Sequence, residues 1–282
     1  MRLVTFKGPD GNPRPGALLE DQVVDISDQV RSIRELIDAG PELLLSIREA
    51  LGKKRGHTPL SQVTLLAPIL SPPRIFCLGL AYRDHAIETH QEIPKVPTIF
   101  LKLTSALNGP HSTVVIPKLT QQPDYEAEFA FVIGKGGKNI PAERWQEHVF
   151  GYTIMNDVSA RDIQMSTSQW SLGKGFDTFA PLGPVIVTQD EIPDPHSLDI
   201  KLSIGGEVLQ HSNTRELIFK IPDLISYISS ITPLEAGDII STGTPAGVGL
   251  GRTPHRWLQP GETIVTEIQG IGQLVNPVVA EA

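Results

Sequence analysis

Two glutamates separated by a single residue are the first feature of this sequence that could perform chemistry. Glu126 and Glu128 stand at the start of the apolar run Phe129–Ile133, whose aromatic and β-branched residues predict a strand. Side chains alternate along a strand, so both carboxylates should lie on one face, roughly 7 Å apart. Asp157 follows a second apolar run and could supply a third carboxylate. A hard divalent cation would offset the repulsion within such a group, although a solvated strand end with unrelated acids would show the same pattern.

A possible general base lies about forty residues earlier, in the polar segment 82–88. If this segment is helical, His85 and Glu88 share one face, and the carboxylate would orient the imidazole and raise its basicity. The flanking sequence is polar or turn-like and offers little apolar surface to hold the helix, so we expect a mobile lid. A surface helix with a chance His/Glu pair is the alternative.

Several polar side chains downstream could bind an anionic substrate. Arg161 and Gln164 follow Asp157 by four and seven residues and could point the same way. The planar guanidinium fork suits a carboxylate, but an ion pair with Asp157 or Asp162 would also explain the arginine. Lys174 lies between two glycines, which would let the backbone approach closely and present the ammonium to a cleft. An exposed turn lysine is the alternative.

A glycine-rich loop at residues 243–249 follows an apolar strand. Backbone N–H groups in such a loop, together with the Thr244 hydroxyl, could hold an anion. The glycines at 247, 249 and 251 superficially resemble a dinucleotide-binding fingerprint, but Arg252-Thr253-Pro254 follows in place of a helix. We therefore expect an anion loop without a nucleotide.

In this order and spacing the motifs resemble the fumarylacetoacetate hydrolase family over about residues 71–279. The segments that carry the resemblance are DYEAEFAFVIGK, MNDVSARDIQ, LGKGFDT and GTPAGVG. The resemblance implies a site for Mg²⁺ or Mn²⁺, with Ca²⁺ as a possible substitute, at Glu126, Glu128 and Asp157. The founding hydrolase has a fourth acidic ligand well upstream of its glutamate pair, and Asp124 is too near to take that role. The sequence therefore resembles the smaller, three-carboxylate branch.

The resemblance also implies roles for the other polar residues. It makes His85 and Glu88 a catalytic pair on a lid helix, and it makes Lys174 and Gln164 the groups that stabilise an oxyanion. Substrate contacts are expected from Arg161, Thr244, Gly243 and Tyr82.

The activity implied is a metal-dependent cleavage of C–C bonds in 2-oxo and β-diketo acids, as in an acylpyruvate-type hydrolase that proceeds through a metal-bound enolate. Oxaloacetate decarboxylation, keto–enol tautomerisation of oxaloacetate and dienoate isomerisation are alternatives that share this enolate, so the sequence separates them poorly. A non-catalytic metal-binding module is the remaining alternative. The simultaneous presence of acids, His/Glu pair, lysine and anion loop argues against it.

Short apolar runs separated by turns dominate the chain, which has 25 glycines and 24 prolines. Helical patterns are few and do not alternate with strands, so we predict a mostly β fold with some helix (α+β) instead of a doubly wound sheet. Ser71-Pro72-Pro73 suggests a boundary between a small N-terminal domain (1–70) and a catalytic domain (71–282). The resemblance implies a mixed β-sandwich roll and a homodimer.

Composition narrows the class of partner. The 282 residues are 40% hydrophobic and 20% charged, and the net charge of −8 argues against a nucleic-acid surface. No run approaches the ~18 apolar residues of a membrane span, and the first residues lack the apolar core of a secretory signal. The single cysteine, Cys77, lies in an apolar run and is expected to pack as a small hydrophobe. We therefore expect a cytoplasmic protein that does not bind nucleic acid or membrane, and the resemblance implies that its partner is a small 2-oxo acid.

Overall fold

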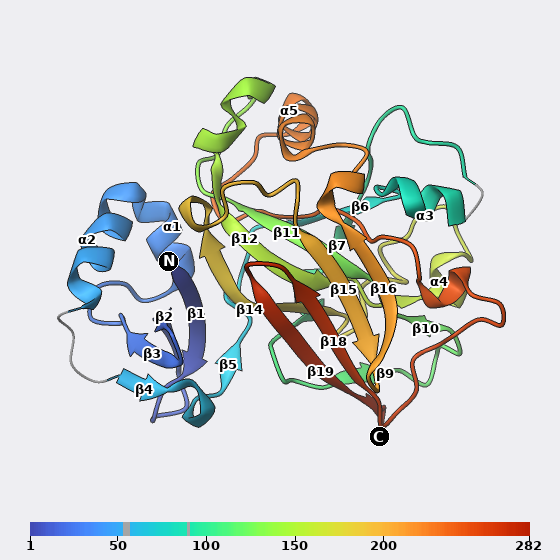
Figure 1. Ribbon diagram of the computed structural model, residues 1–282, viewed down its shortest axis with the longest axis horizontal. Coiled ribbons are helices and arrows are strands. Elements are labelled where there is room, and N and C mark those ends of the chain that lie inside the picture. Colours follow the sequence, from blue (N-terminus) through green and yellow to red (C-terminus); the bar gives the residue numbers. More distant parts are fainter. Residues whose placement is uncertain (53–56, 89–90) are drawn as a thin grey trace.

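Two β-sheets of unequal size make up most of this computed structural model, which describes residues 1–52, 57–88 and 91–282 (Figure 1). The larger sheet contains twelve strands. In chain order they are β1 (Arg2–Lys7), β2 (Pro13–Leu19), β3 (Gln22–Asp25), β4 (His57–Pro59), β5 (Leu65–Leu66), β6 (Ile75–Gly79), β7 (Thr98–Lys102), β8 (Leu107–Asn108), β11 (Ala127–Ile133), β12 (Val149–Asn156), β14 (Ala180–Thr188) and β17 (Ile239–Ser241). The smaller sheet contains β9 (Val114–Ile116), β15 (Asp199–Ile204), β16 (Glu207–Asn213), β18 (Thr263–Ile268) and β19 (Gly272–Ala280).

Helices are short and lie around the sheets. The α-helices are α1 (Ile33–Ala39), α2 (Pro41–Leu51), α3 (Arg83–Glu88), α4 (Arg161–Gln164) and α5 (Ile221–Ile231). A two-stranded ribbon of β10 (Pro123–Asp124) and β13 (Ser159–Ala160) completes the strands. This arrangement confirms the predicted α+β class. None of the helices in the described residues is long and apolar enough to cross a membrane.

Strand β11, which begins directly after Glu126 and carries Glu128, lies inside the larger sheet, whose main path runs β4-β3-β2-β1-β14-β12-β11-β17-β6-β7. The two faces of β11 are buried in different apolar cores: Phe129 and Phe131 contribute to one, Ala130 and Val132 to the other. This alternation is the strand parity predicted from the sequence. Because β11 runs antiparallel to β12 with Ala127 opposite Asn156, the start of β11 and the end of β12 meet at one place.

The N-terminal segment extends the same sheet. In Figure 1 the elements β1 to β4, α1 and α2 gather on one side of the molecule. There β1 pairs antiparallel with β14 through Arg2 opposite Val187 and Leu3 opposite Ile186. The division into domains 1–70 and 71–282 stays a prediction.

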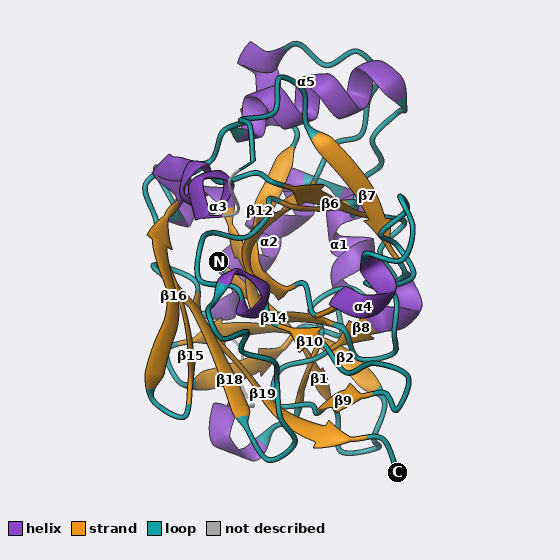
Figure 2. Cartoon of the chain, turned by 90° about the vertical axis from the view of Figure 1, so that its right-hand side faces the viewer, coloured by secondary structure: helices purple, strands orange, loops and turns teal. Residues whose placement is uncertain are grey.

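The smaller sheet lies on the opposite side of the molecule from α1 and α2 (Figure 1). Its strand β16 reaches toward α3 (Figure 2). The Ser212 hydroxyl on β16 donates to Asp84 of α3 at 2.5 Å. On β6, Cys77 is fully buried and packs in an apolar core, as predicted.

Candidate active site

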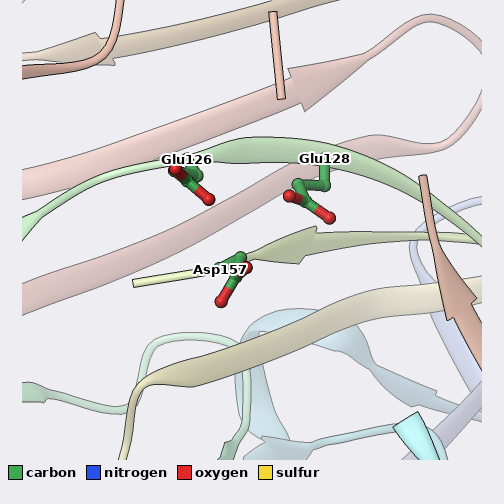
Figure 3. A group of neighbouring side chains, drawn as sticks. All are labelled: Glu126, Glu128 and Asp157. Atoms are coloured by element: carbon green, nitrogen blue, oxygen red, sulfur yellow. The ribbon is translucent and has the colours of Figure 1, made fainter. Parts of the chain in front are cut away.

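The three predicted carboxylates converge where β11 begins and β12 ends (Figure 3). One oxygen from each of Glu126, Glu128 and Asp157 lies within 4.8 Å of the others, and all three residues are buried. Local hydrogen bonds hold this geometry: Asp157 N donates to the Glu126 carbonyl at 2.9 Å, and the Asn156 side-chain oxygen accepts from Glu126 N at 3.0 Å. The register of β11 and β12 thus brings together acids that are about thirty residues apart in the sequence.

Two of the three carboxylates have cationic partners. Lys174 Nζ donates to Glu126 Oε2 and to Asp157 Oδ2, both at 2.7 Å. Arg161 Nη2 donates to Glu126 Oε1 at 2.6 Å, and Lys102 Nζ donates to Asp157 Oδ1 at 2.5 Å. Burial alone would raise the pKa of Glu126, but Lys174 and Arg161 lower it to about 2. Burial would likewise lower the pKa of Lys174, but Asp157 and Glu126 raise it above its usual value.

Glu128 lacks such a cationic partner among the described residues. Its Oε2 accepts from the Ser241 hydroxyl at 2.5 Å and from Gly243 N at 3.2 Å, while its Oε1 is buried without a hydrogen-bond partner. Burial, then Asp157 and Glu126, raise the pKa of Glu128. A buried carboxylate oxygen without a donor, beside two further carboxylates, is a donor set that fits a hard divalent cation. The site can therefore hold a divalent metal through Glu126, Glu128 and Asp157.

A cavity of about 560 Å³ opens beside this group. The predicted site residues that line it are His85, Glu88, Glu126, Arg161, Gln164, Lys174 and Thr244. Phe100 and Trp170 form an apolar wall, with their rings edge to face at a centroid distance of 5.6 Å. The cavity thus combines a charged wall with an aromatic one, which suits a small organic anion.

His85 and Glu88 face each other on α3, as their spacing predicts. His85 Nδ1 lies 3.3 Å from Glu88 Oε2, and Glu88 Oε1 accepts from Gly247 N at 2.9 Å. Asp84 accepts from His85 N at 2.8 Å and from the Ser212 hydroxyl. In this structure α3 is thus hydrogen-bonded to β16 and to the glycine-rich loop, and its mobility as a lid stays a prediction.

Three backbone N–H groups of the glycine-rich loop, those of Gly243, Gly247 and Gly249, already donate to carboxylates of the protein, so fewer are available to an anion than we expected. Gly243 N and Gly247 N donate to Glu128 and Glu88, as described above. Gly249 N and Leu250 N both donate to Asp124, at 2.7 and 3.0 Å. These N–H groups are occupied because carboxylates from segments distant in the sequence reach the loop. Such long-range contacts cannot be predicted from a local motif. The Thr244 hydroxyl, which lines the cavity, remains as the loop's side-chain donor.

Asp124 is fully buried and is joined to the metal-site acid Glu126 through Arg161. Besides the two loop N–H groups, it accepts from Arg161 Nε at 2.8 Å. Arg161 in turn donates from Nη1 to Gln164 Oε1 at 3.0 Å. Among the described residues, Asp124, Gln164 and Glu126 use three of the five guanidinium donors, which leaves two. Arg161 thus forms ion pairs, as the alternative interpretation of this residue predicted. Its partners are Asp124 and Glu126 instead of Asp157 or Asp162.

Two predicted substrate contacts lie behind the cavity wall. Tyr82 is fully buried, and burial, followed by the nearby Glu128, raises the pKa of its hydroxyl. Gly243 contacts Glu128 through its backbone N–H. Neither residue is among those that line the cavity. Their predicted contact with the substrate stays a prediction. Both residues lie near Glu128, and Gly243 donates a hydrogen bond to its carboxylate.

Lys102 and Gln210 are site residues that the sequence reasoning missed. Lys102 ends an edge strand of the larger sheet and is 3% exposed. Gln210 is 1% exposed and connects β16 to the start of β11 and to the glycine-rich loop. A lysine directly after the apolar run Ile99–Leu101 was the available signal for the first. No signal in the sequence marks the second.

Comparison with known proteins identifies the class to which this fold and site belong. The family model described as "Fumarylacetoacetate (FAA) hydrolase C-terminal" matches residues 74–279. The chain belongs to the fumarylacetoacetate hydrolase family, and the resemblance predicted from its motifs is confirmed.

Within the family, the chain is similar to oxaloacetate tautomerases. It is 44% identical over 288 residues to a protein of Xenopus laevis named oxaloacetate tautomerase fahd2, mitochondrial, covering 99% of this chain and 90% of that protein. It is 43% identical over 291 residues to human oxaloacetate tautomerase FAHD2A, mitochondrial, covering 99% of this chain and 92% of that protein. The chain is an enzyme of this family by descent. The similarities support the alternative activities, which include tautomerisation of oxaloacetate, better than they support acylpyruvate hydrolysis.

A solved structure adds information on the metal. Maleylpyruvate hydrolase from Sphingobium sp. SYK-6, solved in complex with manganese(II) ion and pyruvate, is 32% identical with a TM-score of 0.86, and the match covers 100% of both chains. A fumarylacetoacetate hydrolase from Exiguobacterium antarcticum is 38% identical with a TM-score of 0.88, again over 100% of both chains.

The predicted cytoplasmic location is wrong on this comparison, because the oxaloacetate tautomerases of Xenopus laevis and human are named as mitochondrial. The prediction came from an acidic composition and from the lack of a secretory signal. Neither property distinguishes one intracellular compartment from another.

Proposed function

We propose that this protein interconverts the enol and keto forms of oxaloacetate, with Mg²⁺ or Mn²⁺ held by Glu126, Glu128 and Asp157. The observation that carries the proposal is that the His85/Glu88 pair lines the same cavity as Glu126, one of the three clustered carboxylates. Its similarity to proteins named oxaloacetate tautomerase, over 99% of the chain, supports the choice of substrate. When bound, the cation would act as a Lewis acid that polarises the 2-oxo group and orients the adjacent carboxylate.

Tautomerisation moves one proton between C3 of the substrate and the oxygen on C2. His85, whose Nδ1 faces Glu88 in the cavity wall, would exchange the proton at C3. Glu88 would orient the imidazole, and the Gly247 N–H fixes the other oxygen of that carboxylate. The pair would thus act as one base or acid whose ring orientation is set before substrate arrives.

Two neighbouring groups would stabilise negative charge on the C2 oxygen. The Lys174 ammonium has three hydrogens and gives two of them to Glu126 and Asp157, so one remains as far as the described part of the chain is concerned. Gln164 receives Arg161 on its oxygen, which turns its side-chain NH₂ group away from Arg161. Both residues line the cavity, and fixed donors aimed at developing charge are the usual source of such stabilisation. Thr244 and the two remaining donors of Arg161 would bind the substrate carboxylates.

Hydrolysis of acylpyruvates is a second candidate, favoured by the size of the cavity and by its aromatic wall of Phe100 and Trp170. A four-carbon diacid needs neither, whereas a longer acyl group would pack against the two rings. In that reaction His85 would take a proton from water instead of from carbon.

The test follows the loss of the ultraviolet absorbance of enol-oxaloacetate with Mg²⁺, with Mn²⁺ and with EDTA, while pyruvate release is measured separately. We expect metal-dependent enol loss without matching pyruvate release, and a decrease of about 10²–10⁴-fold in His85→Gln. His57→Gln, at an exposed position outside the cavity, is the matched control. Enol loss that is unaffected by EDTA and by His85→Gln would overturn the proposal. Pyruvate release from acylpyruvates without enol turnover would favour the second candidate.

A further inference from the structure

The side chain of Gln210 joins the two halves of the site from behind the cavity wall. It lies on β16, is 1% exposed, and is not among the residues that line the cavity. Its Oε1 accepts from Ala127 N at 2.9 Å, and Ala127 is the residue between the two metal-site glutamates. Its Nε2 donates to the Pro245 carbonyl at 2.9 Å and to the Thr244 hydroxyl oxygen at 2.8 Å. One amide thus connects the start of β11 with the glycine-rich loop.

The orientation of this amide is dictated by its partners. The Ala127 N–H can only donate and therefore requires the amide oxygen, whereas the Pro245 carbonyl can only accept and therefore requires the NH₂ group. With this orientation both NH₂ hydrogens are used, one by Pro245 and the other by Thr244. Gln210 therefore presents a donor to Thr244, and it cannot rotate to present an acceptor without losing two hydrogen bonds in a buried place.

This arrangement decides what the Thr244 hydroxyl can do. A hydroxyl group donates one hydrogen. The Thr244 hydroxyl cannot donate toward Gln210, because the amide NH₂ group on that side is itself a donor. Within the described residues its hydrogen is given to no protein acceptor, and Thr244 lines the cavity. Because the backbone N–H groups of Gly247, Gly249 and Leu250 are already bound to carboxylates, this hydroxyl matters more to an incoming anion than the loop sequence suggests.

We propose that Gln210 is a positioning residue that makes the Thr244 hydroxyl a donor toward a carboxylate group of the substrate. The inference rests on the proposed function, in which Thr244 contacts that carboxylate. Without the amide, the Pro245 carbonyl loses its donor and the Thr244 hydroxyl is no longer constrained to donate into the cavity. Gln210 would thus act on substrate affinity only through Thr244.

A double-mutant cycle tests this dependence. Oxalate, a dicarboxylate that resembles the end of a 2-oxo acid, is titrated calorimetrically into Mn²⁺-loaded wild type, Gln210→Met, Thr244→Val and the double variant. We expect each single substitution to weaken oxalate binding about tenfold, the effect of one hydrogen bond to a charged group. We expect the double variant to bind within about twofold of Thr244→Val, because residues that act through one another are not additive.

Asn276→Leu is the matched control, since Asn276 is also a 1% exposed amide whose NH₂ group joins two carbonyls, those of Gly109 and Ser112, away from the cavity. It should lower the unfolding temperature and leave oxalate affinity unchanged. Mn²⁺ affinity should be retained in all variants.

Should Gln210→Met fail to fold, Gln210→Glu keeps the size of the side chain and the acceptor for Ala127. Its introduced carboxylate would attract the Thr244 hydrogen, so oxalate affinity should fall as pH rises and the introduced group ionises, relative to wild type at each pH. Additive losses of about a hundredfold in the cycle, or an affinity ratio independent of pH in Gln210→Glu, would overturn the inference while the proposed function stands. Absence of oxalate binding by Mn²⁺-loaded wild type would overturn both.

Discussion

Replacement of Lys102 by methionine should expose how strongly the carboxylate group depends on buried cations. The side chains of Lys102 and Asp157 are both 0% exposed, and the ammonium also donates to the Val158 carbonyl at 3.0 Å. Methionine preserves the length and apolar stem of lysine but removes the charge. Asp157 Oδ1 would then be buried without its donor, and Lys174 would be the cation that remains beside Asp157.

The size of the effect follows from the burial of this ion pair. Removal of one partner of a buried pair typically costs about 3–5 kcal/mol, because the other charge is left uncompensated. For a chain of 282 residues, an unfolding entropy of about 2.1 cal/mol/K per residue amounts to roughly 0.6 kcal/mol/K. The unfolding temperature of metal-free Lys102→Met should therefore fall by about 5–8 °C.

Thermal unfolding monitored by circular dichroism measures this change, first in EDTA and then in excess Mn²⁺. Lys201→Met is the matched control, because Lys201 forms an ion pair with Glu267 at 3.5 Å in which both side chains are more than a third exposed. That substitution should change the unfolding temperature by less than about 2 °C. Mn²⁺ should raise the unfolding temperature more in Lys102→Met than in wild type, because the ion then compensates the Asp157 oxygen that has lost its donor. A loss in EDTA no larger than that of the control would refute the reasoning.

Three further perturbations test other parts of the site. Gly251→Ala should lower turnover by up to about 10²-fold with metal affinity intact, since a Cβ there would lie 2.6 Å from Glu88 Cδ; unchanged kinetics would contradict this. Glu128→Gln should abolish calorimetrically detectable Mn²⁺ binding yet raise the metal-free unfolding temperature, because burial, Asp157 and Glu126 all oppose ionisation of that carboxyl group and raise its pKa. Burial, followed by Asp157, raises the pKa of the Cys77 thiol, so the unfolded chain ionises first as pH rises. The stability that Cys77 contributes is complete below about pH 8.5 and should decline above it by roughly 1.4 kcal/mol per pH unit. In denaturant titrations at a series of pH values, this decline of the free energy of unfolding should be absent from Cys77→Ala.

Local sequence patterns were sufficient for the features that depend on neighbouring residues. The alternation after Glu128 predicted a strand with both glutamates on one face, and β11 has that parity because its alternate residues enter two different cores. The spacing of His85 and Glu88 predicted a shared helix face, and α3 places their side chains 3.3 Å apart. The order of the motifs was sufficient to predict the family. Each of these inferences needs only backbone periodicity or sequence order.

Network partners from distant segments could not be predicted in this way. Lys102 and Asp157 are 55 residues apart, Gln210 and Ala127 are 83 apart, and Asp124 and Gly249 are 125 apart. None of these pairs shares a strand or a helix, so no periodicity relates them. The occupied donors of the glycine-rich loop could not be predicted for the same reason, because the carboxylates that accept from Gly243, Gly247 and Gly249 come from elsewhere in the chain. The role of the loop in anion binding stays a prediction.

The sequence by itself therefore determined which chemical groups this protein possesses and which of them share a strand or a helix. The tertiary structure decided which groups are already bound to one another and which face the cavity. In the buried site every donor and acceptor must find a partner or lose hydration without compensation. That requirement is met by pairing between sheets and loops, so the availability of Thr244, Gln164 and Glu128 for a ligand is a property of the fold as a whole.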